Sequence, residues 1–125
     1  MTDRQLMIIA ALTMLVGVGA GAFGAHGLKR MIAPEMLSVW QTAVLYQLIH
    51  GLGMLIVVAL SARLGSPLLN WSGMVMFIGV LIFSGSLYTL VLTGAKWLGA
   101  ITPLGGFAFL IAWAMVAVAA YRAPA

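Results

Sequence analysis

Polar side chains that could do chemistry are few in this chain, and the most informative of them lie around His50. Tyr46 and Gln47 precede His50 by four and three residues, which places the three side chains on one face of a helix. A second polar group lies later in the chain and consists of Ser84, Ser86 and Tyr88. Imidazole changes its charge near neutral pH, so these residues could bind a ligand or carry a proton.

His26 and Thr102 extend this polar group. If the helices alternate in direction, all these positions fall in the half of the molecule nearest residues 29–41 and 94–97. One interpretation is a polar pocket open to one leaflet, and its candidate residues are His26, Tyr46, Gln47, His50, Ser84, Ser86, Tyr88 and Thr102. The other interpretation is a set of hydrogen bonds between helices, which are worth only about 0.6 kcal/mol each in membranes but set the helix register.

Other chemistries lack the residues they need. His26 and His50 differ in expected depth by about 10 Å, so they do not predict a haem pair. A zinc site needs three or four ligands, and the chain has two histidines and no cysteine. Asp3 and Glu35 are the only acids, so a Ser/His/Asp triad is not expected. The sequence predicts no metal, no cofactor and no catalytic residues, and an intramembrane enzyme is the least favoured alternative.

The elements that position these residues are predicted by the spacing of the charges. Eight charged residues leave four uncharged windows of 24, 27, 32 and 25 residues, at 5–28, 36–62, 64–95 and 97–121. A membrane-spanning helix needs about 20 predominantly apolar residues. We therefore predict an all-α membrane protein with a single transmembrane domain, 1–125. The domain is an up-down bundle with spans at about 6–28, 42–62, 71–93 and 98–121.

Composition agrees with this class. The chain is 64% hydrophobic and 6% charged, whereas soluble domains carry about 25% charged residues. The net charge of +4 comes from basic residues scattered at the ends of the predicted spans, a placement typical of contact with lipid headgroups. The expected partner is the lipid bilayer, and nucleic acid is not expected.

The connection between the first two spans allows two structures. Pro34 and Glu35 are typical of the first turn of a helix, and Trp40 follows at helical spacing. Residues 34–40 could form a short helix on the membrane surface, with Trp40 at the interface. Alternatively, one long tilted helix continues through Ala62.

Small residues predict where helices pack closely. Gly17, Gly21 and Ala25 form a stripe with four-residue spacing in the first span, and such stripes let two backbones approach in lipid. A partner helix in the same chain is favoured over a second copy. Gly105 and Gly106 follow Pro103 in the last span, where the freed backbone groups need neighbouring protein.

Charge does not decide the orientation in the membrane. If the spans alternate, one side carries three basic residues, Arg4, Arg63 and Arg122. The other side also carries three, Lys29, Arg30 and Lys96. The positive-inside rule therefore favours neither side.

Four segments in order carry a resemblance that covers essentially the whole chain. They are residues 21–27 (GAFGAHG), residues 41–50 (QT, then YQ and H), residues 83–88 (FSGSLY) and residues 102–106 (TPLGG). Together they resemble the YgdD-like family of small bacterial inner-membrane proteins, a domain of unknown function. The resemblance implies four spans, the bacterial inner membrane and cytoplasmic termini, and it supplies no catalytic or binding residues.

Three non-enzymatic functions remain open. The favoured one is a non-enzymatic accessory or assembly module of a larger inner-membrane complex, because the chain has no soluble part. The first alternative is a small carrier or channel acting as a homo-oligomer, with its site around His50. The second is a lipid- or quinone-binding protein whose headgroup site contains Tyr46, Gln47, His50 and Tyr88.

Overall fold

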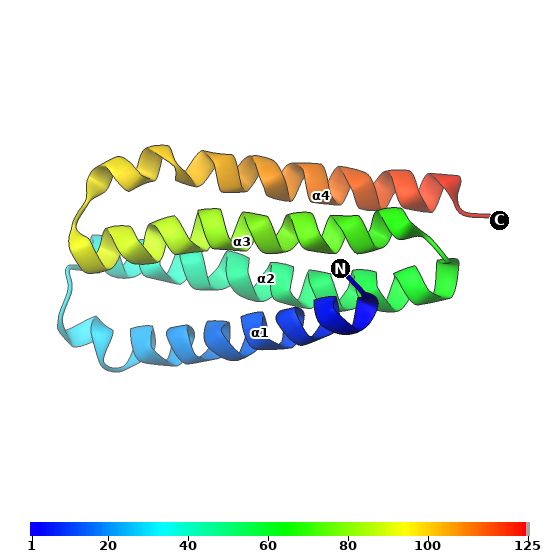
Figure 1. Ribbon diagram of the computed structural model, residues 1–125. Coiled ribbons are helices and arrows are strands. Elements are labelled where there is room, and N and C mark those ends of the chain that lie inside the picture. Colours follow the sequence, from blue (N-terminus) through cyan, green and yellow to red (C-terminus); the bar gives the residue numbers. More distant parts are fainter. Residues whose placement is uncertain (125) are drawn as a thin grey trace.

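The computed structural model describes residues 1–124 and contains four long helices that run alternately up and down (Figure 1). They are α1 (Asp3–Ala25), α2 (Pro34–Leu64), α3 (Pro67–Thr93) and α4 (Thr102–Arg122). Two short 3-10 turns, η1 (Leu28–Arg30) and η2 (Lys96–Ala100), precede α2 and α4. Each long helix is apolar and long enough to cross a membrane. The predicted all-α architecture is confirmed.

Local sequence explains where these helices begin and end. Thr2 and Gln5 form a reciprocal capping box at the start of α1, in which each side chain accepts a hydrogen bond from the other's backbone N–H. Proline occupies the first turn of the other three helices, at Pro34, Pro67 and Pro103. Gly65 and Gly94 end α2 and α3 with φ values of 60° and 74°, a left-handed conformation that favours glycine.

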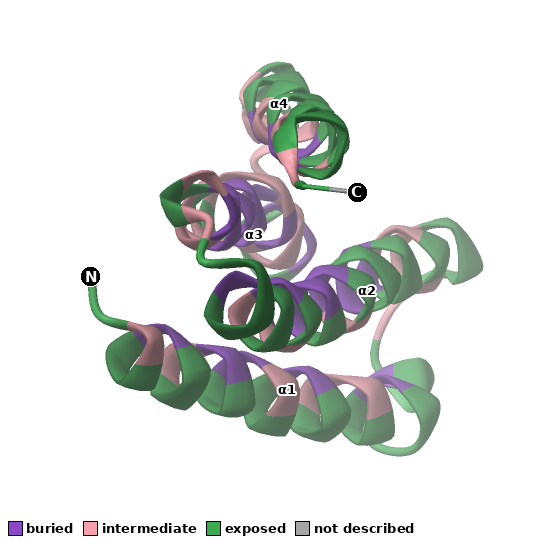
Figure 2. Ribbon diagram, turned by 90° about the vertical axis from the view of Figure 1, so that its right-hand side faces the viewer, coloured by how far each residue is buried: buried purple, intermediate pink, exposed green. Residues whose placement is uncertain are grey.

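The helices pack in sequence order, with α2 and α3 in the middle (Figures 1 and 2). α1 packs mainly on α2, α4 packs mainly on α3, and the two outer helices have no extensive contact with each other. In the most apolar window of each helix, half of the residues of α2 are buried, but only 22% of those of α1 and of α4. The outer helices therefore expose wide apolar faces suited to lipid or to another membrane protein.

The first connection takes the second of its two expected forms. α2 is continuous over 31 residues, so no separate surface helix precedes it. At 1.5 Å per residue it is about 46 Å long, which exceeds a hydrocarbon core of about 30 Å. Trp40 is not an interfacial anchor, because it is buried within the bundle and its Nε1 donates to the Ala20 carbonyl at 2.8 Å. Gly24 makes this possible, since a side chain there would collide with the indole.

The predicted packing glycines separate into contacting and open positions. Gly17 and Gly21 face Leu48 and Val44 of α2 in the same chain, whereas Ala25 is exposed. In α4, a Cβ atom at Gly105 would lie only 2.7 Å from the Cβ of Phe83, so α4 and α3 meet there almost backbone to backbone. Gly106 faces open space.

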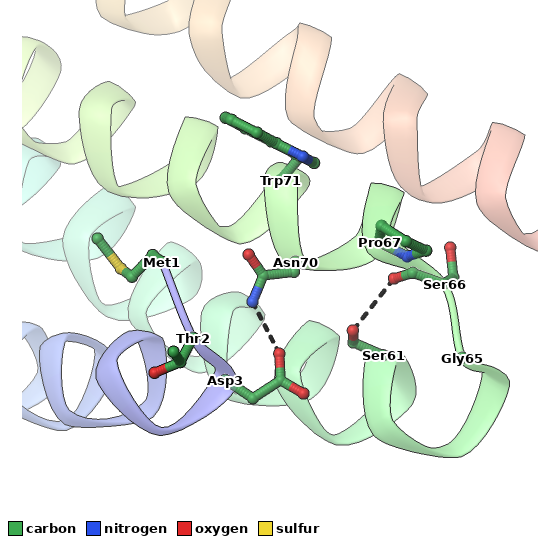
Figure 3. A pocket seen from close by; sticks show the side chains of 9 residues that line it. All are labelled: Met1, Thr2, Asp3, Ser61, Gly65, Ser66, Pro67, Asn70 and Trp71. Carbon is green, nitrogen blue, oxygen red and sulfur yellow. Dashed lines mark hydrogen bonds between the residues drawn. The ribbon is translucent and has the colours of Figure 1, made fainter.

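The start of α1 and the end of α4 lie at the same end of the bundle, beside the α2–α3 turn (Figure 1). A depression of about 410 Å³ with several polar side chains in its lining occurs at this end (Figure 3). Asn70 donates to Asp3 Oδ1 at 2.7 Å, and Ser61 donates to the Ser66 carbonyl at 3.1 Å. The side chain of Trp71 points away from the Asp3–Asn70 contact. These bonds attach the start of α1 to α3 and close the α2–α3 turn.

Candidate functional site

Gln47 joins three helices. Its Nε2 donates to the backbone carbonyl of Thr13 in α1 at 2.9 Å, and its Oε1 accepts from the Tyr88 hydroxyl of α3 at 2.6 Å. The side chain is 4% exposed, so these partners replace water at both ends of the amide. Gln47 therefore acts as a polar bridge between α1, α2 and α3.

His50 lies on the other side of α2, against α4. Its Nδ1 is 2.8 Å from the Tyr46 carbonyl oxygen, and its Nε2 is 3.0 Å from the Trp113 Nε1. A carbonyl oxygen only accepts and an indole N–H only donates. The contacts therefore require a neutral imidazole with its proton on Nδ1, and they occupy both nitrogens. The ring also stacks on Phe109, with 3.6 Å between centroids.

The hydroxyl groups of α3 and α4 form further bonds between helices. Ser84 donates to the Ala43 carbonyl of α2 at 2.7 Å. Ser86 and Thr102 lie 2.6 Å apart across the α3–α4 interface. Both serines are buried, so their hydroxyls need these partners in an apolar surrounding.

His26 stands apart from these contacts. It ends α1 at the C-cap position, and its side chain is exposed. The groove between α2 and α4 that His50 lines does not include His26. The structure therefore separates the two histidines of the predicted pocket.

The predicted polar residues thus lie in several helix interfaces and do not share one cavity. Gln47 and Tyr88 bond to each other between α1, α2 and α3, while His50 faces α4. Within residues 1–124, every buried side-chain nitrogen and oxygen has a hydrogen-bond partner. The same part of the chain holds no group of three or more residues suited to bind a metal ion. The geometry favours hydrogen bonding between helices over a shared polar pocket.

A groove between α2 and α4 brings two predicted residues, Tyr46 and His50, together with aromatic residues of α3 and α4 that sequence reasoning missed as site residues. This α2–α4 groove has a volume of about 450 Å³ and is lined by Tyr46, His50, Phe83, Pro103, Gly106, Phe107, Phe109, Leu110 and Trp113. One signal was present in the sequence, because Trp113 falls inside a span although tryptophan favours membrane interfaces. An indole N–H at that depth needs an acceptor, and His50 supplies it.

The Gln47 bridge gives a testable prediction. Gln47→Leu should lower the free energy of unfolding by about 1–2 kcal/mol, since it removes two hydrogen bonds and leaves the Tyr88 hydroxyl without its acceptor. Tyr88→Phe should lower the free energy of unfolding by less than Gln47→Leu does. The double variant should be no less stable than Gln47→Leu alone. Unfolding by SDS titration in mixed micelles measures all four proteins.

Thr89→Val is the matched control for this cycle. The Thr89 hydroxyl bonds only to the Gly85 carbonyl of its own helix, so its loss should change stability by less than about 0.5 kcal/mol. Strictly additive losses in the double variant would contradict a direct bond between Gln47 and Tyr88.

Comparison with known proteins gives a family and no activity. Residues 20–106 match the family described as Protein of unknown function (DUF423). The chain is 48% identical over 120 residues to the UPF0382 membrane protein YwdK of Bacillus subtilis, covering 95% of this chain and 98% of the relative. It is also 48% identical over 119 residues to a UPF0382 membrane protein of Staphylococcus aureus, covering 95% and 97%.

No solved structure matches the chain. The relatives are named membrane proteins, in agreement with the four apolar helices, and they confirm the expected kind of family, small membrane proteins without assigned function. The YgdD-like name itself stays a resemblance. The chain is an integral membrane protein that belongs to the DUF423 family of unknown function.

Proposed function

We propose that this protein is a non-enzymatic accessory or assembly module of the bacterial inner membrane, with both termini in the cytoplasm. The observation that carries the proposal is that every buried side-chain nitrogen and oxygen within residues 1–124 already has a hydrogen-bond partner in the fold. Side chains that are already bonded within the fold stabilise one arrangement of helices. Catalysis or transport would instead need groups that can exchange partners.

His50 illustrates this point. A carrier controlled by His50 would protonate the imidazole, and protonation of Nε2 would replace the bond from Trp113 by an unfavourable contact between two donors. Asp3 and Glu35 lie in the first turns of α1 and α2, so neither offers a carboxylate deep in a span. These features favour the module over the small carrier or channel.

The outer helices supply the docking faces in this proposal. Leu15 of α1 is 67% exposed, and Ile111 of α4, which does not line the α2–α4 groove, is 51% exposed. Figure 2 shows α1 and α4 on opposite sides of the α2–α3 pair. Helices associate in lipid through close packing of such faces. Because α1 and α4 barely contact each other, partner helices could pack on either face without disturbing the interior.

Site-specific photo-crosslinking in intact cells tests the module. A photoreactive residue at Leu15 or Ile111 should give a discrete adduct with one other membrane protein. The same residue at Leu52, an exposed position of the central helix α2, is the matched control and should give none. Adducts of twice the chain mass would favour the oligomeric carrier instead, and lipid adducts alone at both positions would contradict the module.

Orientation is checked in the same cells. The chain has no cysteine, so a single Ala123→Cys variant reports on one site without background. Its protection from a membrane-impermeant maleimide supports cytoplasmic termini, and ready labelling contradicts them.

A further inference from the structure

The α2–α4 groove has the lining of a small-molecule site. Small-molecule pockets are typically about 300–1,000 Å³, mostly apolar and aromatic, with a few polar groups. The groove is about 450 Å³, and five of its nine lining residues are Tyr46, Phe83, Phe107, Phe109 and Trp113. Its lining contains no acidic or basic side chain other than the neutral His50. An uncharged ligand therefore fits it best.

The groove opens on the apolar outer surface of the bundle and runs along α4 toward the middle of that helix. Phe107 and Leu110 on its rim are 64% and 68% exposed, so a molecule dissolved in lipid can enter from the side. Its α4 wall runs from Pro103 to Trp113, ten residues or about 15 Å along the helix. That length is about half of a hydrocarbon core of about 30 Å. The groove therefore extends from the Lys96 end of the bundle toward the bilayer centre.

Tyr46 supplies the free polar group of the groove. Tyr46 is 37% exposed and its hydroxyl makes no hydrogen bond within residues 1–124, whereas both nitrogens of His50 are occupied. The Tyr46 ring is nearly parallel to the rings of His50 and Phe109, at interplanar angles of 10° and 20°. A hydroxyl in an apolar surrounding gains from an acceptor. The aromatic surface open to a flat ligand ring comes from Tyr46, Phe107 and Trp113, which are 37%, 64% and 42% exposed.

We propose that the α2–α4 groove binds a neutral amphiphile with a flat, carbonyl-bearing ring, the chemistry of a membrane quinone. The ring packs among the aromatic side chains, and one carbonyl oxygen accepts a hydrogen bond from the Tyr46 hydroxyl. An apolar tail leaves the groove past Phe107 and Leu110 into the bilayer. A phospholipid fits less well, because its charged phosphate meets no basic side chain in the groove.

Gly106 allows the groove to be filled without disturbing the fold. It lines the groove, and a Cβ atom added there has no neighbour within 4 Å. Gly106→Leu should therefore place a side chain in the ligand space. Gly19 of α1 is equally open but lies outside the groove, so Gly19→Leu is the matched control.

Titration of the purified protein in phospholipid nanodiscs with decylubiquinone tests the proposal. Quenching of tryptophan fluorescence should saturate, because Trp113 lines the groove. The dissociation constant should rise about fivefold in Tyr46→Phe, the effect of one hydrogen bond. It should rise at least tenfold in Gly106→Leu and stay unchanged in Gly19→Leu.

Phospholipid is in large excess in the nanodisc, so saturation there also shows preference over phospholipid. Quenching that rises linearly and equally in all four proteins would mean simple partition into the bilayer and would overturn the proposal. If Gly106→Leu proves unstable by SDS titration, an unchanged dissociation constant in Tyr46→Phe would still overturn it. Failure to find a partner protein by crosslinking would leave this result unaffected.

Discussion

Gly105→Ala should lower the free energy of unfolding by about 2–3 kcal/mol, the cost of forcing an extra methyl group into a packed contact. The new Cβ would lie 2.7 Å from the Cβ and 2.8 Å from the Cα of Phe83. A rotamer change cannot relieve a contact with backbone, so α4 must move away from α3. Unfolding by SDS titration should show the loss.

The neighbouring glycine is the control. Gly106→Ala meets no atom within 4 Å, so it should leave stability unchanged or raise it by up to about 1 kcal/mol through helix propensity. Equal effects of the two substitutions would mean that α4 is not held against α3 at Gly105. Gly105→Ala and Gly106→Ala add the same methyl group at adjacent positions of α4, so a difference in stability between them reports on the contact with Phe83 alone.

His50→Ala should lower the free energy of unfolding by about 2–4 kcal/mol, the range expected when a buried ring and its hydrogen bonds are lost together. The substitution removes the stacking on Phe109 and leaves the Trp113 N–H without an acceptor. It should also shift the fluorescence of Trp113, which reports on the polarity around the indole. Thermal and SDS unfolding of the purified protein measure the loss of stability.

His26→Ala is the matched control, since His26 is exposed at the end of α1. It should change stability by less than about 0.5 kcal/mol. A stable His50→Ala protein that lost a proton or ion flux would instead restore the carrier hypothesis. Comparison of the two histidine variants therefore separates a structural role of His50 from a transport role.

Much of the fold could be predicted because a bilayer restricts the chain strongly. Apolar windows between charges imply helices, and the structure has four. Gly17 and Gly21 were predicted to pack closely, and they face α2. The spacing extended this stripe to Ala25, but the structure buries Gly24 in its place. A stripe with period four drifts around a helix of 3.6 residues per turn, so its end loses the contact.

The candidate site was predicted less well. Tyr46, Gln47 and His50 share one broad face in a helical projection, yet Gln47 bonds toward α1 and α3 while His50 bonds toward α4. Spacing of three or four residues leaves side chains up to 60° apart around the axis, enough to meet different neighbours. Periodicity also contained no information on which part of α4 lies beside His50.

The sequence by itself determined the number of helices and their membrane character. The physical reason is that every backbone N–H and C=O in hydrocarbon must be bonded within its own segment, so long apolar windows become helices. The tertiary structure decided which polar group bonds to which, and where the α2–α4 groove opens. Those features depend on the rotation and neighbours of each helix, which are set by close packing at residues such as Gly24 and Gly105.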